Sequence, residues 1–269
     1  MEKFRYDPGQ LIAVADSFCK INRLRLEAGL GRKPLLQTPE LIGIFFAFIT
    51  GRVRDFKSFY DRLGGFMMRT FFKKTPSYSS LIRRLSKIGE LLPNMVNGED
   101  QSGFYVIDST AFALCQRFRF HSRKLFPEFA DWTASSTGWT FGFKLHLVVN
   151  ALGKIIAWRI SNGSKHDIAE AENLLRRLKG TAIGDRGYCS CAMRKRLAEN
   201  GLDFIARAKS NMHEQNTEKE LKLLERRYLV ELVIRKLKNY VGNSFSRFRA
   251  WSAVCGIAAL GIILINLSL

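Results

Sequence analysis

After residue 102 the chain changes to a succession of short β-type segments, and this pattern limits the possible folds more than any other feature. The first three segments are GFYVIDST, FGFKLHLVV and KIIAWRIS, which are rich in β-branched and aromatic residues. A glycine-containing turn over 150–153 predicts that the second and third form a hairpin. Helix-type and strand-type segments then alternate, with strands at TAIGD and DFIARA and a long basic helix over about 218–240. This order predicts a mixed α/β sheet covered by helices on both faces.

Residues 1–100 show helical rather than strand patterns. One helix is predicted to begin at Thr38-Pro39-Glu40 and to end at Gly51, and another to run from about Asp55 to Leu63. A third begins near Ser77, and it carries basic residues beside an apolar face. Short helices that end in a basic one are typical of helix-turn-helix DNA-binding domains.

The polar segment LPNMVNGEDQS, residues 92–102, predicts the domain boundary because it is rich in turn-forming residues. We therefore expect a helical, DNA-binding domain over 1–98 and an α/β domain over 99–269 that includes a C-terminal helix. The C-terminal segment from Ala250 to Leu269 carries no charge and is long enough to span a bilayer. Because it contains Gly256 and Gly261, a buried helix explains it equally well, and a membrane anchor is the less favoured alternative.

The charge balance points to a polyanionic partner. The chain has 43 Lys and Arg against 24 Asp and Glu, a formal net charge of +19. Nucleic acid is the commonest partner of so basic a globular protein, although a ribosome-associated or merely basic protein would have the same composition. The five cysteines match no zinc-binding template, and they indicate a reducing cytosol. The N-terminus MEKFRYDPGQ lacks an apolar signal core, which also predicts a cytoplasmic location.

Three acidic residues stand where a catalytic site would need them. Asp108 ends the apolar run of the first strand segment, and Asp185 ends the segment TAIGD, where Gly187 allows a sharp turn. Glu231 lies in the middle of the long helix. Taken singly, the aspartates are simple turn-formers, and Glu231 forms an ion pair with Arg235. Taken together, they offer the oxygen ligands that Mg²⁺ or Mn²⁺ prefers, and two such ions can promote phosphodiester displacement.

These segments resemble the DDE transposases of bacterial insertion sequences, in particular the group related to insertion sequence four. The resemblance rests on VIDST, GFKLHL, NGSKHD, GDRGY and RYLVELVIRKLK and covers about residues 100–250. That group's helix signature is a tyrosine, an arginine three residues later, a glutamate four after that and a lysine seven further on. Arg227, Glu231 and Lys238 fit these intervals, whereas Leu224 stands in the tyrosine position. Glu225 is the alternative glutamate, but Leu232 stands where its lysine would be required.

The resemblance implies a ribonuclease-H-like catalytic domain with a helical domain before it. It implies that Asp108 and Asp185 hold two Mg²⁺ or Mn²⁺ ions and that Glu231 completes the site. Arg227, Lys238 and Lys144 would contact DNA phosphates, and the strength of binding would fall with salt. Further positions are expected to serve as loop, helix cap, structural residue or DNA contact: Lys165, His166, Asp167, His146, Arg117, Arg119, Arg123 and Lys124.

The implied partners are the terminal inverted repeats of an element, target DNA and further copies of the chain, with no small-molecule substrate. The implied location is the bacterial cytoplasm, at the nucleoid. Two other functions would use the same fold: a DNA-binding derivative that has lost catalysis, and a different ribonuclease-H-like nuclease such as a resolvase. The Arg–Glu–Lys spacing favours the transposase over the nuclease.

Overall fold

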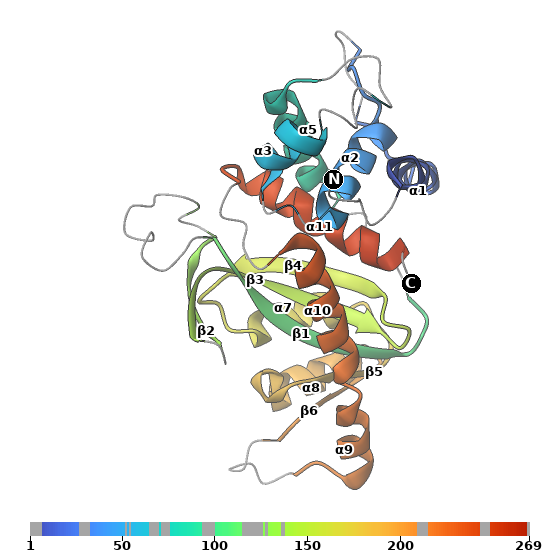
Figure 1. Cartoon of the computed structure of the whole chain (residues 1–269). Coiled ribbons are helices and arrows are strands. Elements are labelled where there is room, and N and C mark those ends of the chain that lie inside the picture. The colour runs from blue at the N-terminus through green and yellow to red at the C-terminus, as the bar shows by residue number, and fades with distance from the viewer. Residues whose placement is uncertain are drawn as a thin grey trace. The chain divides into compact units, whose positions relative to one another are not determined.

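The computed structural model describes residues 7–26, 33–51, 53, 55–64, 70, 76–92, 100–114, 126, 129–135, 138–208, 215–242 and 248–267. The chain divides into two compact units, residues 1–95 with 237–268 and residues 96–236 with Leu269. Figure 1 shows their elements. Most of the expected boundary at 92–102 lies outside the described residues, as do Arg117, Arg119, Arg123 and Lys124.

The second unit is built on a curved six-stranded sheet (Figure 1). Its strands are β1 Phe104–Ala113, β2 Asp131–Ser135, β3 Gly138–Asn150, β4 Ile155–Asn162, β5 Gly180–Gly184 and β6 Leu202–Ala206. Strand β3 pairs antiparallel with β1 along one edge and with β2 and then β4 along the other. Strands β1, β5 and β6 run parallel to one another. The predicted mixed α/β sheet is confirmed.

Helices cover both faces of this sheet. Helices α7 Ile168–Leu175 and α8 Cys191–Glu199 pack against one face, in an apolar core that includes Tyr105 and Ile107 of β1. Because side chains alternate along a strand, the neighbouring Asp108 points to the opposite face. The first part of α10, Tyr228–Val241, lies on that opposite face (Figure 1). The alternation within β1 therefore separates the apolar core from the charged positions.

The first unit consists of helices. They are α1 Pro8–Ile21, α2 Thr38–Thr50, α3 Phe56–Phe59 with the π-helical turn η1 Tyr60–Gly64, α5 Tyr78–Leu91 and α11 Trp251–Leu267. The predicted start near Ser77 is confirmed, since its hydroxyl accepts a hydrogen bond from the Ser80 N–H and so caps α5. Helix α2 begins one residue earlier than a Thr38 cap would give, because Gln37 and Glu40 form a capping box.

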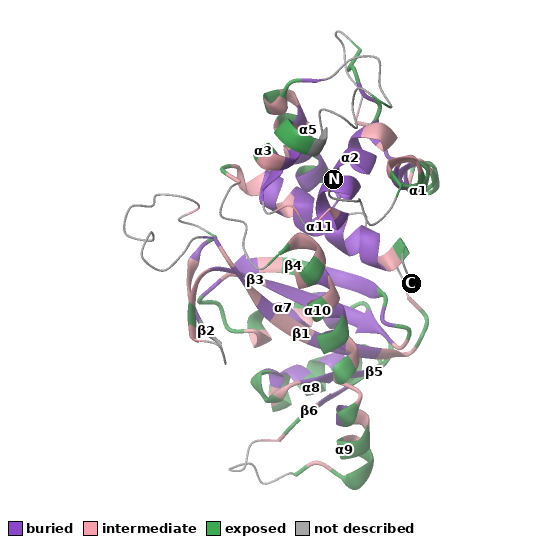
Figure 2. Cartoon of the chain, viewed as in Figure 1, coloured by how far each residue is buried: buried purple, intermediate pink, exposed green. Residues whose placement is uncertain are grey.

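The C-terminal helix α11 packs with α5 and α2, although from its sequence we expected it to belong to the α/β domain. It is apolar on all sides and is buried over most of its length, as Figure 2 shows. Helices α11 and α5 approach closely because Gly256 of α11 and Gly89 of α5 face each other. A Cβ on Gly89 would lie 1.7 Å from the carbonyl oxygen of Ser252. In the described part of the chain, no helix is long and apolar enough to cross a membrane.

The structure corrects the sequence-based expectations for two elements that bear on the site. The long helix expected over about 218–240 is two helices, α9 Glu218–Glu225 and α10, separated by Arg226 and Arg227. Strand β1 continues to Ala113, so Asp108 lies within the strand and not at its end. Strand β2 was not predicted, although its five residues DWTAS alternate between polar and apolar side chains as a strand does.

Candidate active site

The sheet register brings Asp108 and Asp185 next to each other. Strands β1 and β5 are parallel, and Val106 and Ile183 are their last paired residues. Asp108 and Asp185 each lie two residues further along, so they stand at equivalent positions of the two chain segments. Strand β5 ends at Gly184, and β1 continues with only β3 beside it. The two carboxylates thus lie where β5 leaves the sheet, as expected for sites at the ends of parallel strands.

Local backbone structure fixes the Asp185 carboxylate. Its oxygen Oδ1 accepts a hydrogen bond from the Gly187 N–H, which caps the short 3-10 helix Arg186–Tyr188. Gly187 does not have a positive φ angle, unlike six other glycines of the described chain. A Cβ at this position would lie 3.0 Å from Asp185 Oδ1. Glycine is therefore favoured here because it leaves space beside the carboxylate, and not because of the sharp turn that the sequence suggested.

Glu231 is contributed by helix α10, which follows α9 after a break at Arg226 and Arg227. It lies in the first turn of α10, where the positive end of the helix dipole favours a carboxylate. The break places Arg227 immediately before α10. Its guanidinium Nη2 lies 3.7 Å from Asp108 Oδ2, 4.0 Å from Asp185 Oδ2 and 3.7 Å from Glu231 Oε1. The structure thus brings the three predicted acids together around one cation.

The ion pair of Glu231 is formed with Arg227 and not with Arg235, the partner that the simplest interpretation of the helix suggested. Arg227 lies four residues before Glu231 and Arg235 four residues after it, so both positions lie on the same side of a helix. Only Arg227 is close to the two aspartates of the sheet. The carboxylates of Asp108 and Asp185 attract Arg227 to this position, so Arg227 and not Arg235 pairs with Glu231.

The carboxyl group of Asp108 is mostly buried, and its ionisation is perturbed. Burial raises the pKa of Asp108 to about 6, although the Ser109 N–H, 2.8 Å from Oδ1, and the Arg227 guanidinium both lower it. The nearby carboxylates of Asp185 and Asp167 raise it further. Because burial disfavours the ionised form of Asp108, an additional cation at this position would stabilise the ionised carboxylate.

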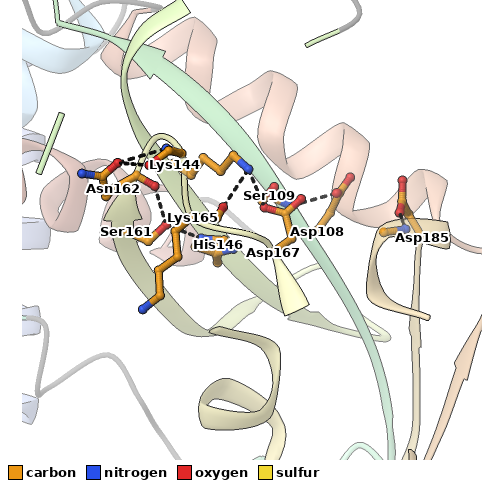
Figure 3. A network of polar contacts seen from close by, with 11 residues as sticks. Asp108, Ser109, Lys144, His146, Ser161, Asn162, Lys165, Asp167 and Asp185 are labelled. Atoms are coloured by element: carbon orange, nitrogen blue, oxygen red, sulfur yellow. Dashed lines mark hydrogen bonds and ion pairs between the residues drawn. The ribbon is translucent and has the colours of Figure 1, made fainter. Parts of the chain in front are cut away.

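A polar network supports the loop 162–167 beside Asp108 (Figure 3). Lys144 Nζ donates to the Lys165 carbonyl at 3.0 Å and to Asp167 Oδ1 at 3.1 Å. The ammonium of Lys144, predicted as a DNA contact, is thus engaged within the chain. Asp167 stands at the N-terminus of α7, as expected, but its side chain makes no capping hydrogen bond and binds Lys144 instead.

His146 and Glu170 are two buried titratable members of this network. His146 Nε2 lies 2.7 Å from Ser161 Oγ, and burial lowers the pKa of His146 to about 4, so the ring is neutral. This supports the structural interpretation of His146. Glu170, whose side chain is 2% exposed, pairs with both Arg159 and Lys165. Sequence reasoning missed Glu170, because nothing in an amphipathic helix distinguishes a buried glutamate from an exposed one.

Lys238 lies seven residues after Glu231, which is about two turns further along α10. It belongs to the helical unit of the chain. Burial lowers the pKa of Lys238. Arg227 directly precedes α10, and its ion pair with Glu231 keeps the spacing of one helical turn that the sequence predicted.

The donor set suits a hard divalent cation, because it consists of carboxylate oxygens alone. Among the described residues, no three His, Cys, Asp or Glu side chains lie close enough together to hold a metal ion as they stand. The reason is visible in the geometry: Arg227 is the cation that the three carboxylates surround. The residues therefore fit a divalent ion in their chemistry. Because the three oxygens lie 3.7–4.0 Å from Arg227 Nη2, the carboxylates as well as Arg227 have to move for an ion to be bound.

Comparison with known proteins identifies the family of this unit. A family model described as "Transposase DDE domain" matches residues 98–251, more than half of the chain. Among solved structures, the chain is similar to a piggyBac transposase in a cryo-EM synaptic complex with hairpin DNA. The TM-score is 0.53 at 12% sequence identity, over 97% of this chain and 74% of that chain, so this similarity concerns the fold. No curated protein matches the chain significantly. The chain belongs to the transposase DDE domain family, whose members are enzymes of DNA transposition.

Proposed function

We propose that Asp108, Asp185 and Glu231 form a metal-dependent site that cuts DNA at the ends of a mobile element and joins the freed 3′-hydroxyl to target DNA. The observation that carries the proposal is the convergence of these three carboxylates, from β1, the end of β5 and the start of α10, on a single guanidinium. Carboxylates repel one another, so a fold that gathers three of them provides for strong positive charge at that point.

Each acid has a distinct part in the proposed site. Asp108 and Asp185 would hold the ions from the sheet, where paired strands keep their positions fixed. Glu231 would complete the ligand set from the opposite side. DDE transposase domains generally use divalent metal ions, and bound Mg²⁺ or Mn²⁺ would activate a water or a 3′-hydroxyl and stabilise the leaving oxygen. Because the Glu231 side chain is 53% exposed, DNA has access to this side of the cluster.

Basic side chains would position the DNA backbone. Arg227 and Lys238 are the proposed phosphate contacts, and Lys144 would contact DNA only by releasing Asp167. The helices of the first unit are the proposed DNA-binding domain. On α5, Arg83 and Lys87 are exposed, whereas Arg84 donates to the Leu36 carbonyl at 2.6 Å and so supports the fold.

The finer assignment is to the group related to insertion sequence four. It is supported by the intervals between Arg227, Glu231 and Lys238 and by the segments NGSKHD and GDRGY. The piggyBac structure is a synaptic complex with DNA. By analogy, we propose that two or more copies of this chain assemble on paired element ends, at the bacterial nucleoid.

Removal of the metal tests this proposal. We expect the purified full-length chain to nick duplex DNA carrying the inverted repeats that flank its gene, and to join the new 3′-hydroxyl to a supercoiled target, in Mg²⁺ or Mn²⁺. Both products should disappear in excess EDTA and return when Mg²⁺ is restored, because the carboxylates alone cannot activate the nucleophile. Gel analysis of an end-labelled duplex measures both steps. Cleavage that persists in EDTA would exclude a metal-dependent site.

A further inference from the structure

Arg227 is held at the centre of the carboxylate cluster without a close hydrogen bond to any of its members. Its three distances of 3.7, 4.0 and 3.7 Å are ion-pair distances. A charge-assisted hydrogen bond between such groups would be about 2.8 Å long. Within the described chain, the Nε atom of Arg227 is buried and has no hydrogen-bond partner. The guanidinium thus balances three negative charges without being fixed to one of them.

We propose that Arg227 is an exchangeable counter-cation, which neutralises the cluster before divalent ions enter and is released by them to contact a DNA phosphate. This inference rests on the proposed function, since it requires that metal ions bind at Asp108, Asp185 and Glu231. It assigns to Arg227 a role in metal loading in addition to its proposed contact with DNA. The two roles alternate, because one guanidinium cannot occupy both positions.

The exchange follows from the charges and from the place of Arg227 in the chain. Three ionised carboxylates and one guanidinium leave two negative charges uncompensated, so divalent ions are still attracted to the cluster. A divalent ion among the same oxygens repels the guanidinium and displaces it. Arg227 can respond because it stands in the break between α9 and α10, and its side chain is 28% exposed. Arginine suits this task, since it keeps its charge at every physiological pH and binds phosphate well.

A consequence is that metal binding and DNA binding support each other. Metal entry makes the guanidinium available to DNA, and a phosphate that holds the guanidinium makes the carboxylates available to metal. Such coupling is reciprocal by thermodynamic necessity. The site would therefore load its ions most readily when an element end is already in place, which restricts cleavage to assembled complexes.

Metal affinity in the absence of DNA provides the test. Mn²⁺ binding to the full-length chain is measured by the loss of the free-ion electron paramagnetic resonance signal, at pH 8 so that Asp108 is ionised. We expect Arg227→Gln to bind Mn²⁺ about tenfold more tightly than the unmodified chain, because the ion no longer has to displace a cation about 4 Å from each carboxylate. Because lysine is shorter than arginine and holds its charge further from the carboxylates, Arg227→Lys should bind Mn²⁺ about threefold more tightly than the unmodified chain.

Arg235→Gln is the matched control, since it removes the same charge on the other side of Glu231. Among the described residues, Arg235 forms no ion pair, and its substitution should change Mn²⁺ affinity less than about twofold. Equal or weaker binding by Arg227→Gln than by the unmodified chain overturns the proposal. If circular dichroism shows Arg227→Gln to be unfolded, Arg227→Lys decides, and unchanged affinity overturns the proposal. If no form binds Mn²⁺, or if Asp185→Ala does not weaken binding, the three-carboxylate site itself is wrong.

Discussion

Replacing Asp185 by alanine is expected to lower the rate of element-end cleavage by about 10³-fold, equivalent to about 4 kcal/mol in the activation barrier. The substitution removes a proposed ligand of the metal ions and leaves the sheet intact, because Asp185 follows β5 and its side chain is 42% exposed. Affinity for the DNA end should change less than about twofold, since Asp185 carries no positive charge toward phosphate. Single-turnover cleavage of an end-labelled duplex and a gel-shift titration measure the two quantities.

Asp203→Ala is the control for this substitution. Asp203 lies on the neighbouring strand β6, its side chain is 56% exposed, and it pairs with Arg194 at 3.5 Å. It carries the same charge but lies outside the cluster, so its loss should leave cleavage unchanged within about twofold. Cleavage by Asp185→Ala at the rate of Asp203→Ala would show that the site has been wrongly assigned.

The second large effect is expected at Asp108, where Asn should abolish cleavage and at the same time stabilise the protein in the absence of metal. The buried carboxylate has its pKa raised from 3.8 to about 6, so its ionised form is disfavoured in the folded chain. Neutral asparagine has nearly the same shape and removes this penalty. We expect the free energy of unfolding at pH 8 in EDTA to rise by up to about 3 kcal/mol, which corresponds to the difference between a pKa of 3.8 and one of about 6. Cleavage should fall by about 10³-fold.

The pH dependence follows from the same pKa. An aspartate whose pKa is higher in the folded than in the unfolded state destabilises the fold when it is ionised. For Asp108 this destabilisation is complete above a pH of about 6, and it disappears as the pH falls toward 3.8. The stability difference between Asp108→Asn and the unmodified chain should therefore shrink between pH 6 and pH 4. Urea unfolding at several pH values in EDTA measures it.

Asp131→Asn serves as the matched variant for this comparison. Asp131 Oδ1 accepts from the Trp132 N–H at 2.7 Å, just as Asp108 Oδ1 accepts from the Ser109 N–H at 2.8 Å. Asparagine keeps that acceptor in both positions, so Asp131→Asn should leave stability within about 0.5 kcal/mol of the unmodified chain. If Asp108→Asn is no more stable than Asp131→Asn at pH 8, burial of the ionised Asp108 carboxylate does not destabilise the folded chain.

The order of strands and helices in the α/β unit could be predicted from sequence because each segment carries its own pattern. GFYVIDST, FGFKLHLVV, KIIAWRIS, TAIGD and DFIARA each coincide with a strand to within three residues at either end. That Asp108 and Asp185 belong to one site was expected because each ends an apolar run, and sites in α/β sheets form at strand ends. The position of Asp108 within β1 did not follow, because the strand's continuation depends on β3 as a partner.

The break before α10 could not be predicted, because the residues LLERRYLVEL all favour a helix or tolerate one. Contacts with distant residues account for it. The Arg226 guanidinium lies 4.1 Å from the centre of the Phe104 ring, and the neighbouring Arg227 reaches the three carboxylates. Similarly, the partners of α11 could not be named in advance, since an apolar helix shows that it is buried but not which helices bury it.

The central claim, that Asp108, Asp185 and Glu231 act as one site, is tested most directly at Glu231, which comes from a different part of the fold. Glu225 provides the comparison: it lies six residues earlier, is exposed, and ends α9. Cleavage of an end-labelled element end in Mg²⁺ is measured for Glu231→Gln and Glu225→Gln. We expect Glu231→Gln to lose at least about 10²-fold in rate and Glu225→Gln to match the unmodified chain. Loss of cleavage in Glu225→Gln alone, or equal rates in both variants, would contradict this assignment.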